Sequence, residues 1–232
     1  GSIETLKTDF FSNVSHEIKT PLAVIQNNAE LLRREPLTER GQDCADTIYQ
    51  SSRRLSDLIS NILKLNKLEK QTITPTSEAY DVCAQLAECA LNFEEAWESR
   101  GLDFDADIED RAEIVADPTL MELVWNNLFS NAVKFTEPGG SISLREFSDD
   151  GNVYVSVRDT GCGMDEETKK HIFEKFYQGD TSHATAGNGL GLALALRVLQ
   201  LNGFSIQVES APGEGSVFTV TMPRADKGDD VK

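Results

Sequence analysis

The chain has 232 residues, which is enough for one or two domains with a buried core. Its 39 Asp and Glu residues outnumber its 22 Lys and Arg residues, which gives a formal net charge of -17. An acidic surface repels the phosphates of nucleic acids and anionic lipids, so binding to nucleic acid is not expected. The four cysteines include no CxxC pair and only three histidines accompany them, which argues against a zinc site.

No apolar run in the sequence approaches the roughly 18 residues that a membrane span requires, and no signal peptide is recognisable. The opening Gly1-Ser2 is typical of a cloning remnant, so we expect the chain to be a fragment of a longer protein. The scattered unpaired cysteines fit a reducing compartment.

Two amphipathic helices are predicted at the start of the chain. In residues 3–34 apolar side chains recur every three or four positions and form one continuous stripe. Glu35-Pro36-Leu37 ends this helix, and Thr38 is a suitable N-cap for a second one that extends to about Lys70. A single hairpin leaves apolar surface uncovered, so we expect two copies to pair as a four-helix bundle in a homodimer.

A mixed domain is predicted after a short linker. Residues 71–77 are polar and contain Pro75, and the composition changes beyond them. A helical stretch at 81–100 comes first, and short alternating apolar runs typical of strands then alternate with helical stretches as far as residue 224. This order predicts an α+β domain over residues 78–224, in which helices cover one face of a sheet. Residues 225–232 are expected to be a polar tail.

His16 is the first candidate for chemistry. At about 100° per residue it falls roughly 160–200° from the centre of the apolar stripe near Val14, so it is expected to point away from the core of its hairpin. Glu17 could hold or take the proton of one ring nitrogen and leave the other nitrogen free as a nucleophile. Thr20 lies one turn further on, and Pro21 is expected to kink the helix. On position alone, an ordinary surface histidine is the competing interpretation.

Two glycine-rich segments are candidates for nucleotide binding. Residues 159–163 (Asp-Thr-Gly-Cys-Gly) follow a predicted strand, where glycines permit a sharp turn and a carboxylate could accept a hydrogen bond from the N6 amine of adenine. Residues 187–192 (Gly-Asn-Gly-Leu-Gly-Leu) precede an apolar helix whose first backbone N–H groups suit phosphate. Each signal is weak alone, and the second is not a dinucleotide fingerprint because no strand precedes it.

A third candidate is a predicted helix that places Asn127, Asn131 and Lys134 on one side within two turns. Two amide oxygens at positions i and i+4 can bind Mg²⁺, and a lysine one turn further on can balance phosphate charge. The competing interpretation is an ordinary polar face of a helix.

Taken together, these segments resemble the catalytic core of sensor histidine kinases over residues 3 to about 224. The resemblance is carried by five segments in the order of the family, namely 11–22 (H-box), 127–135 (N-box), 159–163 (G1 box), 172–176 (F-box) and 187–192 (G2 box).

The resemblance implies a fold and a reaction. The fold would be a dimerisation and phosphotransfer hairpin over residues 3–70, followed by an ATP-binding sandwich of the gyrase and Hsp90 type. His16 would accept phosphate from ATP, with Glu17 as its proton partner, and Thr20 would orient water when the protein dephosphorylates its partner. That partner would be a response regulator, whose receiver domain offers an aspartate.

The resemblance also implies roles in the nucleotide site. Asn127 and Asn131 would carry Mg²⁺, Lys134 would lie on the phosphates, and Asp159 would recognise adenine, with clearance from Gly161 and Gly163. The remaining implied contacts to the nucleotide are Phe135, Gly187, Gly189, Leu190 and Gly191. Residues 176–188 would form a mobile lid, in which Gln178 stands where relatives often have arginine. His171 and His183 are expected to be surface residues.

The full-length protein implied by the resemblance is a bacterial membrane protein. This chain would be its cytoplasmic portion, and contact with the membrane would occur only through a segment outside the chain. Two alternatives remain open at this point. One is a nucleotide-gated ATPase or clamp of the gyrase and Hsp90 type, with Glu122 as the nearest candidate for its catalytic carboxylate. The other is a degenerate kinase that only dimerises and binds a partner.

Overall fold

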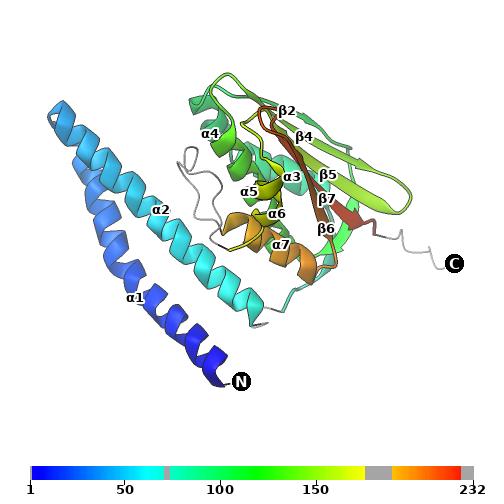
Figure 1. Cartoon of the computed structure of the whole chain (residues 1–232), viewed down its shortest axis with the longest axis horizontal. Helices are drawn as coiled ribbons and strands as arrows, with labels where there is room; N and C mark the ends of the chain where they lie inside the picture. Colours follow the sequence, from blue (N-terminus) through cyan, green and yellow to red (C-terminus); the bar gives the residue numbers. More distant parts are fainter. Residues whose placement is uncertain (1, 71–73, 176–189, 226–232) are drawn as a thin grey trace. The chain divides into compact units, whose positions relative to one another are not determined.

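The computed structural model describes residues 2–70, 74–175 and 190–225 of the chain (Figure 1). The chain divides into two compact units, residues 1–73 and residues 74–232. The division falls within the polar segment 71–77, whose composition predicts a linker. Within the described ranges, no helix is both long and apolar enough to cross a bilayer.

The first unit is a hairpin of two long helices, α1 (Ser2–Arg33) and α2 (Glu39–Glu69). α1 continues through Pro21, although proline removes one backbone donor from the helix. α2 begins after Thr38, whose side-chain oxygen accepts a hydrogen bond from the Gly41 N–H at 3.0 Å. Thr38 is therefore confirmed as the N-cap of the second helix.

Each helix of the hairpin carries two lines of residues at seven-residue spacing. The buried lines consist of Ser15, Leu22 and Ala29 on α1 and of Ala45, Ser52 and Ile59 on α2. The exposed lines consist of Ile18, Ile25 and Leu32 on α1 and of Ile48 and Leu55 on α2, and these side chains are 39–50% exposed. The single apolar stripe expected around Val14 is thus two neighbouring lines, and only one of them is covered within the chain.

A polar contact joins the two helices next to the loop of the hairpin. The Nε of Arg33 on α1 donates to Oδ1 of Asp46 on α2 at 2.7 Å, and the same guanidinium lies over the ring of Tyr49 at 4.4 Å. An ion pair together with a cation–π contact fixes which turn of α2 faces the end of α1.

The second unit is built on a five-stranded sheet in the order β2-β4-β5-β7-β6. Its strands are β2 (Asp103–Asp107), β4 (Ser141–Ser148), β5 (Asn152–Asp159), β6 (Ser205–Ser210) and β7 (Ser216–Pro223). β2 pairs in parallel with β4, whereas the other neighbours are antiparallel. A separate two-stranded ladder joins β1 (Glu78–Asp81) to β3 (Glu113–Ala116).

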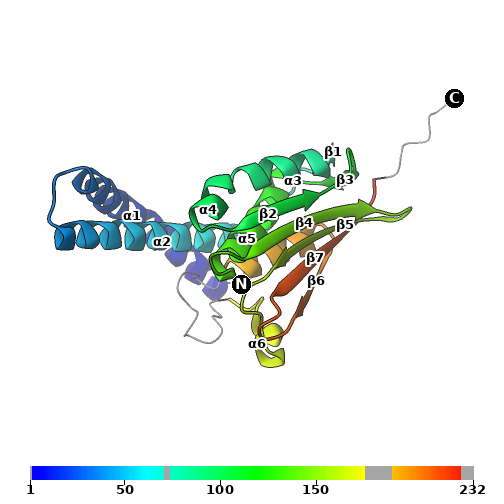
Figure 2. The same cartoon turned by 90° about the horizontal axis from the view of Figure 1, so that it is seen from above.

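Helices cover one face of the five-stranded sheet, as Figures 1 and 2 show. The helices of this unit are α3 (Val82–Leu91), α4 (Glu94–Ser99), α5 (Pro118–Phe135), α6 (Glu166–His171) and α7 (Gly191–Leu201). Burial alternates along β4, β5 and β7, so each strand turns one set of side chains into the core beneath the helices. The helical hairpin and the α+β layer predicted from the sequence are both confirmed, except that the stretch expected as one helix over 81–100 is two, separated at Asn92 and Phe93.

A buried carboxyl group lies under α3. Glu146 on β4 is 4% exposed, and its Oε2 accepts hydrogen bonds from the Cys83 thiol at 3.0 Å and from the Glu109 N–H at 2.9 Å. Its Oε1 has no hydrogen-bond partner among the described residues. Burial raises the pKa of Glu146 above its ordinary value, and the neighbouring Glu109 carboxyl group adds to this rise.

This arrangement predicts that stability falls as the pH rises. A carboxyl group whose pKa is raised in the folded state stabilises that state below its unfolded pKa of about 4.5, and this contribution is lost as the pH rises through the folded pKa. Glu146→Gln should therefore flatten the decline in the free energy of unfolding above pH 5, by on the order of 1 kcal/mol. Urea unfolding at pH 5 and pH 8 measures the effect. Glu113→Gln, at a half-buried position on β3, is the control, and equal pH slopes for wild type and Glu146→Gln would contradict the prediction.

Candidate functional site

The candidate acceptor His16 is an exposed residue on α1. It follows Ser15 of the buried line directly and lies two residues before Ile18 of the exposed line, so helical geometry turns it away from both. Glu17 and Thr20 are exposed as well. The structure thus confirms that the ring of His16 is accessible, with a carboxylate and a hydroxyl on the same stretch of helix.

The end of α5 and the glycine-rich turn after β5 meet in the second unit. A Cβ atom on Gly161 would collide with the backbone carbonyl oxygen of Phe135, the last residue of α5. Gly163 has φ +69, and a Cβ atom there would collide with the carbonyl oxygen of Ala211. Only glycine fits such close backbone approaches, so two segments singled out in the sequence, 127–135 and 159–163, form one surface.

Asp159 ends β5 at this surface and is 5% exposed. Its Oδ1 accepts a hydrogen bond from the Gly161 N–H at 2.9 Å. Burial raises the pKa of Asp159, whereas hydrogen bonds from the backbone N–H groups of Gly161 and Ser216 oppose that rise. A desolvated carboxylate held by backbone donors keeps a fixed direction, which suits recognition of an amine on a planar base.

The start of α7 lies against α5 at Asn127, about two turns before the end of that helix. A Cβ atom on Gly191 would come within 2.6 Å of Oδ1 of Asn127, while Nδ2 of Asn127 donates to the Leu123 carbonyl at 2.7 Å. The amide oxygen of Asn127 is therefore the atom turned toward α7. Leu190, the N-cap of α7, provides no side-chain hydrogen bond to the first turn, which leaves the positive end of the helix suited to phosphate.

The donor set is consistent with a magnesium ion. Asn127 and Asn131 are half-buried and lie one turn apart on α5, so both amide groups are on the same side of the helix. Mg²⁺ prefers such oxygen ligands and is usually bound together with substrate phosphates. Lys134 is exposed in the last turn of α5, where its charge favours a neighbouring anion.

Comparison with known families gives one match in each of the two units of the chain. The domain described as "His Kinase A (phospho-acceptor) domain" matches residues 6–71, and the one described as "Histidine kinase-, DNA gyrase B-, and HSP90-like ATPase" matches residues 116–226. The chain belongs to the sensor histidine kinase family. Its second unit is an ATP-binding domain of that family.

Curated relatives of this histidine kinase align over almost its whole length. The circadian input-output histidine kinase CikA of Synechococcus elongatus is 38% identical and covers 94% of the chain. The phosphate regulon sensor protein PhoR of Pseudomonas aeruginosa is 32% identical and also covers 94%. The chain spans 30% of CikA and 50% of PhoR, so it corresponds to a part of these relatives.

Solved structures show the same fold. Full-length ShkA in complex with AMPPNP has a TM-score of 0.76 at 29% identity, covering 94% of this kinase and 46% of ShkA. The histidine kinase AdeS of Acinetobacter baumannii has a TM-score of 0.65 at 20% identity, covering 91% of this kinase and 98% of AdeS, and supports the fold alone. The predicted combination of a helical hairpin and an ATP-binding sandwich is therefore confirmed.

Glu122 does not share the site with the two asparagines. It precedes Asn131 by nine residues on α5, which turns it about 180° away around the helix. Its charge instead acts on Cys89 of α3, on another side of α5 from Gly191. The position of Glu122 therefore argues against a clamp-type ATPase in which Glu122 is the catalytic carboxylate.

Part of the predicted site lies outside the described residues. Gly187 and Gly189, the lid at 176–188, Gln178 and His183 all belong to this part. His171 is described, and its ring nitrogens lie 2.7 Å from Glu174 Oε1 and 3.1 Å from Glu167 Oε1. These carboxylates raise its pKa.

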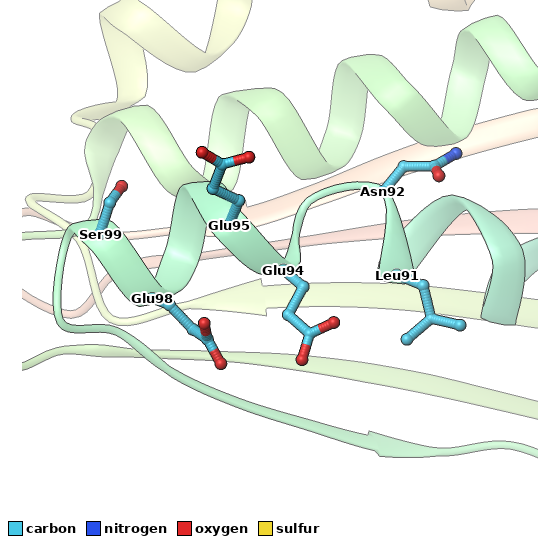
Figure 3. A pocket seen from close by; sticks show the side chains of 6 residues that line it. All are labelled: Leu91, Asn92, Glu94, Glu95, Glu98 and Ser99. Atoms are coloured by element: carbon cyan, nitrogen blue, oxygen red, sulfur yellow. The ribbon is translucent and has the colours of Figure 1, made fainter.

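A hollow on α3 and α4 is separate from these motifs (Figure 3). It has a volume of about 620 Å³ and is lined by Leu91, Asn92, Glu94, Glu95, Glu98 and Ser99. The carboxylate of Glu95 points away from those of Glu94 and Glu98 in Figure 3, so the three acids do not converge on a common ligand. Among the described residues, no group of three or more acids, histidines or cysteines is placed to hold a metal ion.

Sequence patterns do not mark the turn between β6 and β7 as part of the site. Gly215 in this turn has φ +74, and a Cβ atom there would collide with the carbonyl oxygen of Asp159. The only local indication of this contact is the pair of glycines in residues 211–215, because closely spaced glycines in a tight turn permit another backbone to approach.

Proposed function

We propose that this chain is the catalytic core of a protein-histidine kinase that transfers the γ-phosphoryl group of ATP to His16. The observation that carries the proposal is the close approach of three segments in the ATP-binding unit. Gly161 meets the end of α5, and Gly191 brings the start of α7 to Asn127. Asp159, the two asparagines and the N-terminus of α7 then offer partners for the base, the metal and the phosphates.

In the proposed reaction, a ring nitrogen of His16 attacks the γ-phosphorus and the bond to the β-phosphate oxygen breaks, so that ADP leaves. Glu17 holds or takes the proton of the imidazole as the new N–P bond forms. Mg²⁺ held by Asn127 and Asn131 would neutralise phosphate charge, which is the main requirement of phosphoryl transfer. Movement of the second unit about residues 71–77 would deliver the γ-phosphate to His16.

A second transfer would pass the phosphoryl group to an aspartate in the receiver domain of a response regulator. A hollow of about 500 Å³ beside Thr20 supports docking at this place. It is lined from both helices of the hairpin, by Lys19, Ala23, Val24 and Asn27 with Thr20 on α1 and by Ser56 on α2. Thr20 is then placed to orient water if the kinase also dephosphorylates the regulator.

The exposed lines on α1 and α2 support a homodimer. They continue over Ile18, Ile25 and Leu32 on one helix and over Ile48 and Leu55 on the other at the seven-residue spacing of helical bundles. Burial of these lines against a second copy would complete a four-helix bundle.

We further propose that the whole protein is a bacterial membrane sensor, attached through a segment outside this chain with the kinase core in the cytoplasm.

Incubation with labelled ATP tests the proposed function. With Mg²⁺, label from γ-labelled ATP should become attached to the protein in an acid-labile form, whereas α-labelled ATP should leave no label. Chelation of the metal with EDTA should suppress the reaction. Release of ADP without any phosphoprotein would support the clamp-type ATPase instead and would contradict the kinase.

A further inference from the structure

The turn at residues 211–215, between β6 and β7, packs directly on the loop that holds Asp159. The Gly213 N–H donates to the Cys162 carbonyl at 2.7 Å. The positions of Gly163 and Gly215 leave no room for a Cβ atom, because each faces a carbonyl oxygen of the opposite segment. The loop and the turn therefore touch through main-chain atoms along their length.

One side chain, Ser210 at the end of β6, joins the two segments. Its hydroxyl donates to the Gly215 carbonyl at 2.8 Å and accepts from the Met164 N–H at 2.8 Å. A third partner is the hydroxyl of Ser216, also at 2.8 Å. Since a serine hydroxyl has one proton and two acceptor positions, the proton between the two serines must come from Ser216, and all three positions of Ser210 are used.

These bonds extend to the carboxyl group of Asp159. Ser216 is the residue opposite Asp159 in the β5–β7 ladder, and its backbone N–H supports the carboxylate. Gly215 lies against the carbonyl of Asp159, while Met164 follows the same glycine-rich loop. Ser210 thus joins the Met164 end of the loop to Gly215 and Ser216, the two residues that lie against Asp159.

We propose that Ser210 is a positioning residue for recognition of the adenine base. It holds the Asp159 loop against β7, so that the carboxylate keeps the direction needed to accept from the exocyclic amine. The inference rests on the proposed function, in which Asp159 binds that amine. Guanine presents a carbonyl oxygen at the corresponding position and repels a carboxylate, so the orientation of Asp159 decides between the two bases.

The test is a comparison of ATP and GTP binding by Ser210→Ala, measured as competition with a fluorescent ATP analogue. Loss of the hydroxyl leaves the Met164 N–H and the Gly215 carbonyl without this partner. ATP affinity should fall about tenfold, and GTP affinity should change less than about twofold, because the lost orientation concerns only the amine. The preference for ATP should therefore fall by at least about fivefold. Ser205→Ala, at the exposed other end of β6, is the matched control and should retain the preference.

Two further variants separate positioning from a general effect on folding. Ser210→Thr keeps the hydroxyl and should restore the preference for ATP. If Ser210→Ala does not fold, Ser210→Cys, with a similar shape and weaker hydrogen bonds, should show the same loss of preference. Equal weakening of ATP and GTP binding, or an unchanged preference, would overturn the role of Ser210. Absence of ATP binding by the wild-type chain would instead contradict the proposed function itself.

Discussion

Replacement of His16 by alanine should abolish incorporation of acid-labile phosphate from γ-labelled ATP. His16 is exposed on α1 beside Glu17, and alanine removes the ring nitrogen that would form the N–P bond. The labelled product should fall to background, a loss of at least about 100-fold, because no other group performs the same step. ATP binding should be unchanged, since the nucleotide motifs belong to the second unit.

His171→Ala is the matched control for this experiment. It removes a histidine of the second unit whose ring lies between Glu167 and Glu174, and labelling should remain at the wild-type level. Label that persists in His16→Ala would show that another residue accepts the phosphate. If His171→Ala loses the label and His16→Ala keeps it, the acceptor belongs to the second unit, and the proposed reaction is refuted.

Asn131→Asp should weaken Mg-ATP binding by at least about 100-fold while leaving the proposed homodimer intact. The change puts a carboxylate on the side of α5 where Asn127 and Gly191 meet, next to the expected position of the triphosphate. Two like charges about 4 Å apart repel by about 4 kcal/mol at an effective dielectric constant of 20, whereas a 100-fold loss of affinity requires about 2.8 kcal/mol. Titration calorimetry with Mg-ATP gives the affinity, and light scattering gives the mass of the complex.

Glu122→Gln serves as the control on the same helix. Glu122 lies on another side of α5, so the variant should bind Mg-ATP like the wild type and should still be labelled on His16. Unchanged affinity in Asn131→Asp would remove the two asparagines from the site. Loss of nucleotide turnover in Glu122→Gln alone would favour the clamp-type ATPase.

Local signals predicted most of the fold. The proline after α1, the cap at Thr38 and the alternating runs of β4 and β5 each act within a few residues, and the structure confirms them. The faces of α1 were harder to predict because hydrophobicity alone does not separate two neighbouring lines. Ser15 is polar but buried, and Ile18 is apolar but exposed, so the centre expected near Val14 lies beside the exposed line and about 100° from Ser15 of the buried line.

The site shows the same limit. The segments around Asn127, Asp159 and Gly191 are recognisable from local patterns, and the structure brings them together. Ser210 has no such pattern, because its contribution depends on a hydrogen bond from Met164, which is 46 residues away in the sequence. Contacts of this kind arise only from the tertiary fold.

The main-chain surface next to Asp159, formed at Gly161, Gly163 and Gly215, has a consequence for inhibition of the kinase. Gly161, Gly163 and Gly215 each face a backbone carbonyl, so any larger side chain at these positions would displace main-chain atoms. A compound whose shape complements this surface contacts main-chain atoms, which side-chain substitutions at other positions leave in place. A mutation that confers resistance to such a compound would have to alter the backbone itself, and it would therefore also lower the affinity of the kinase for ATP.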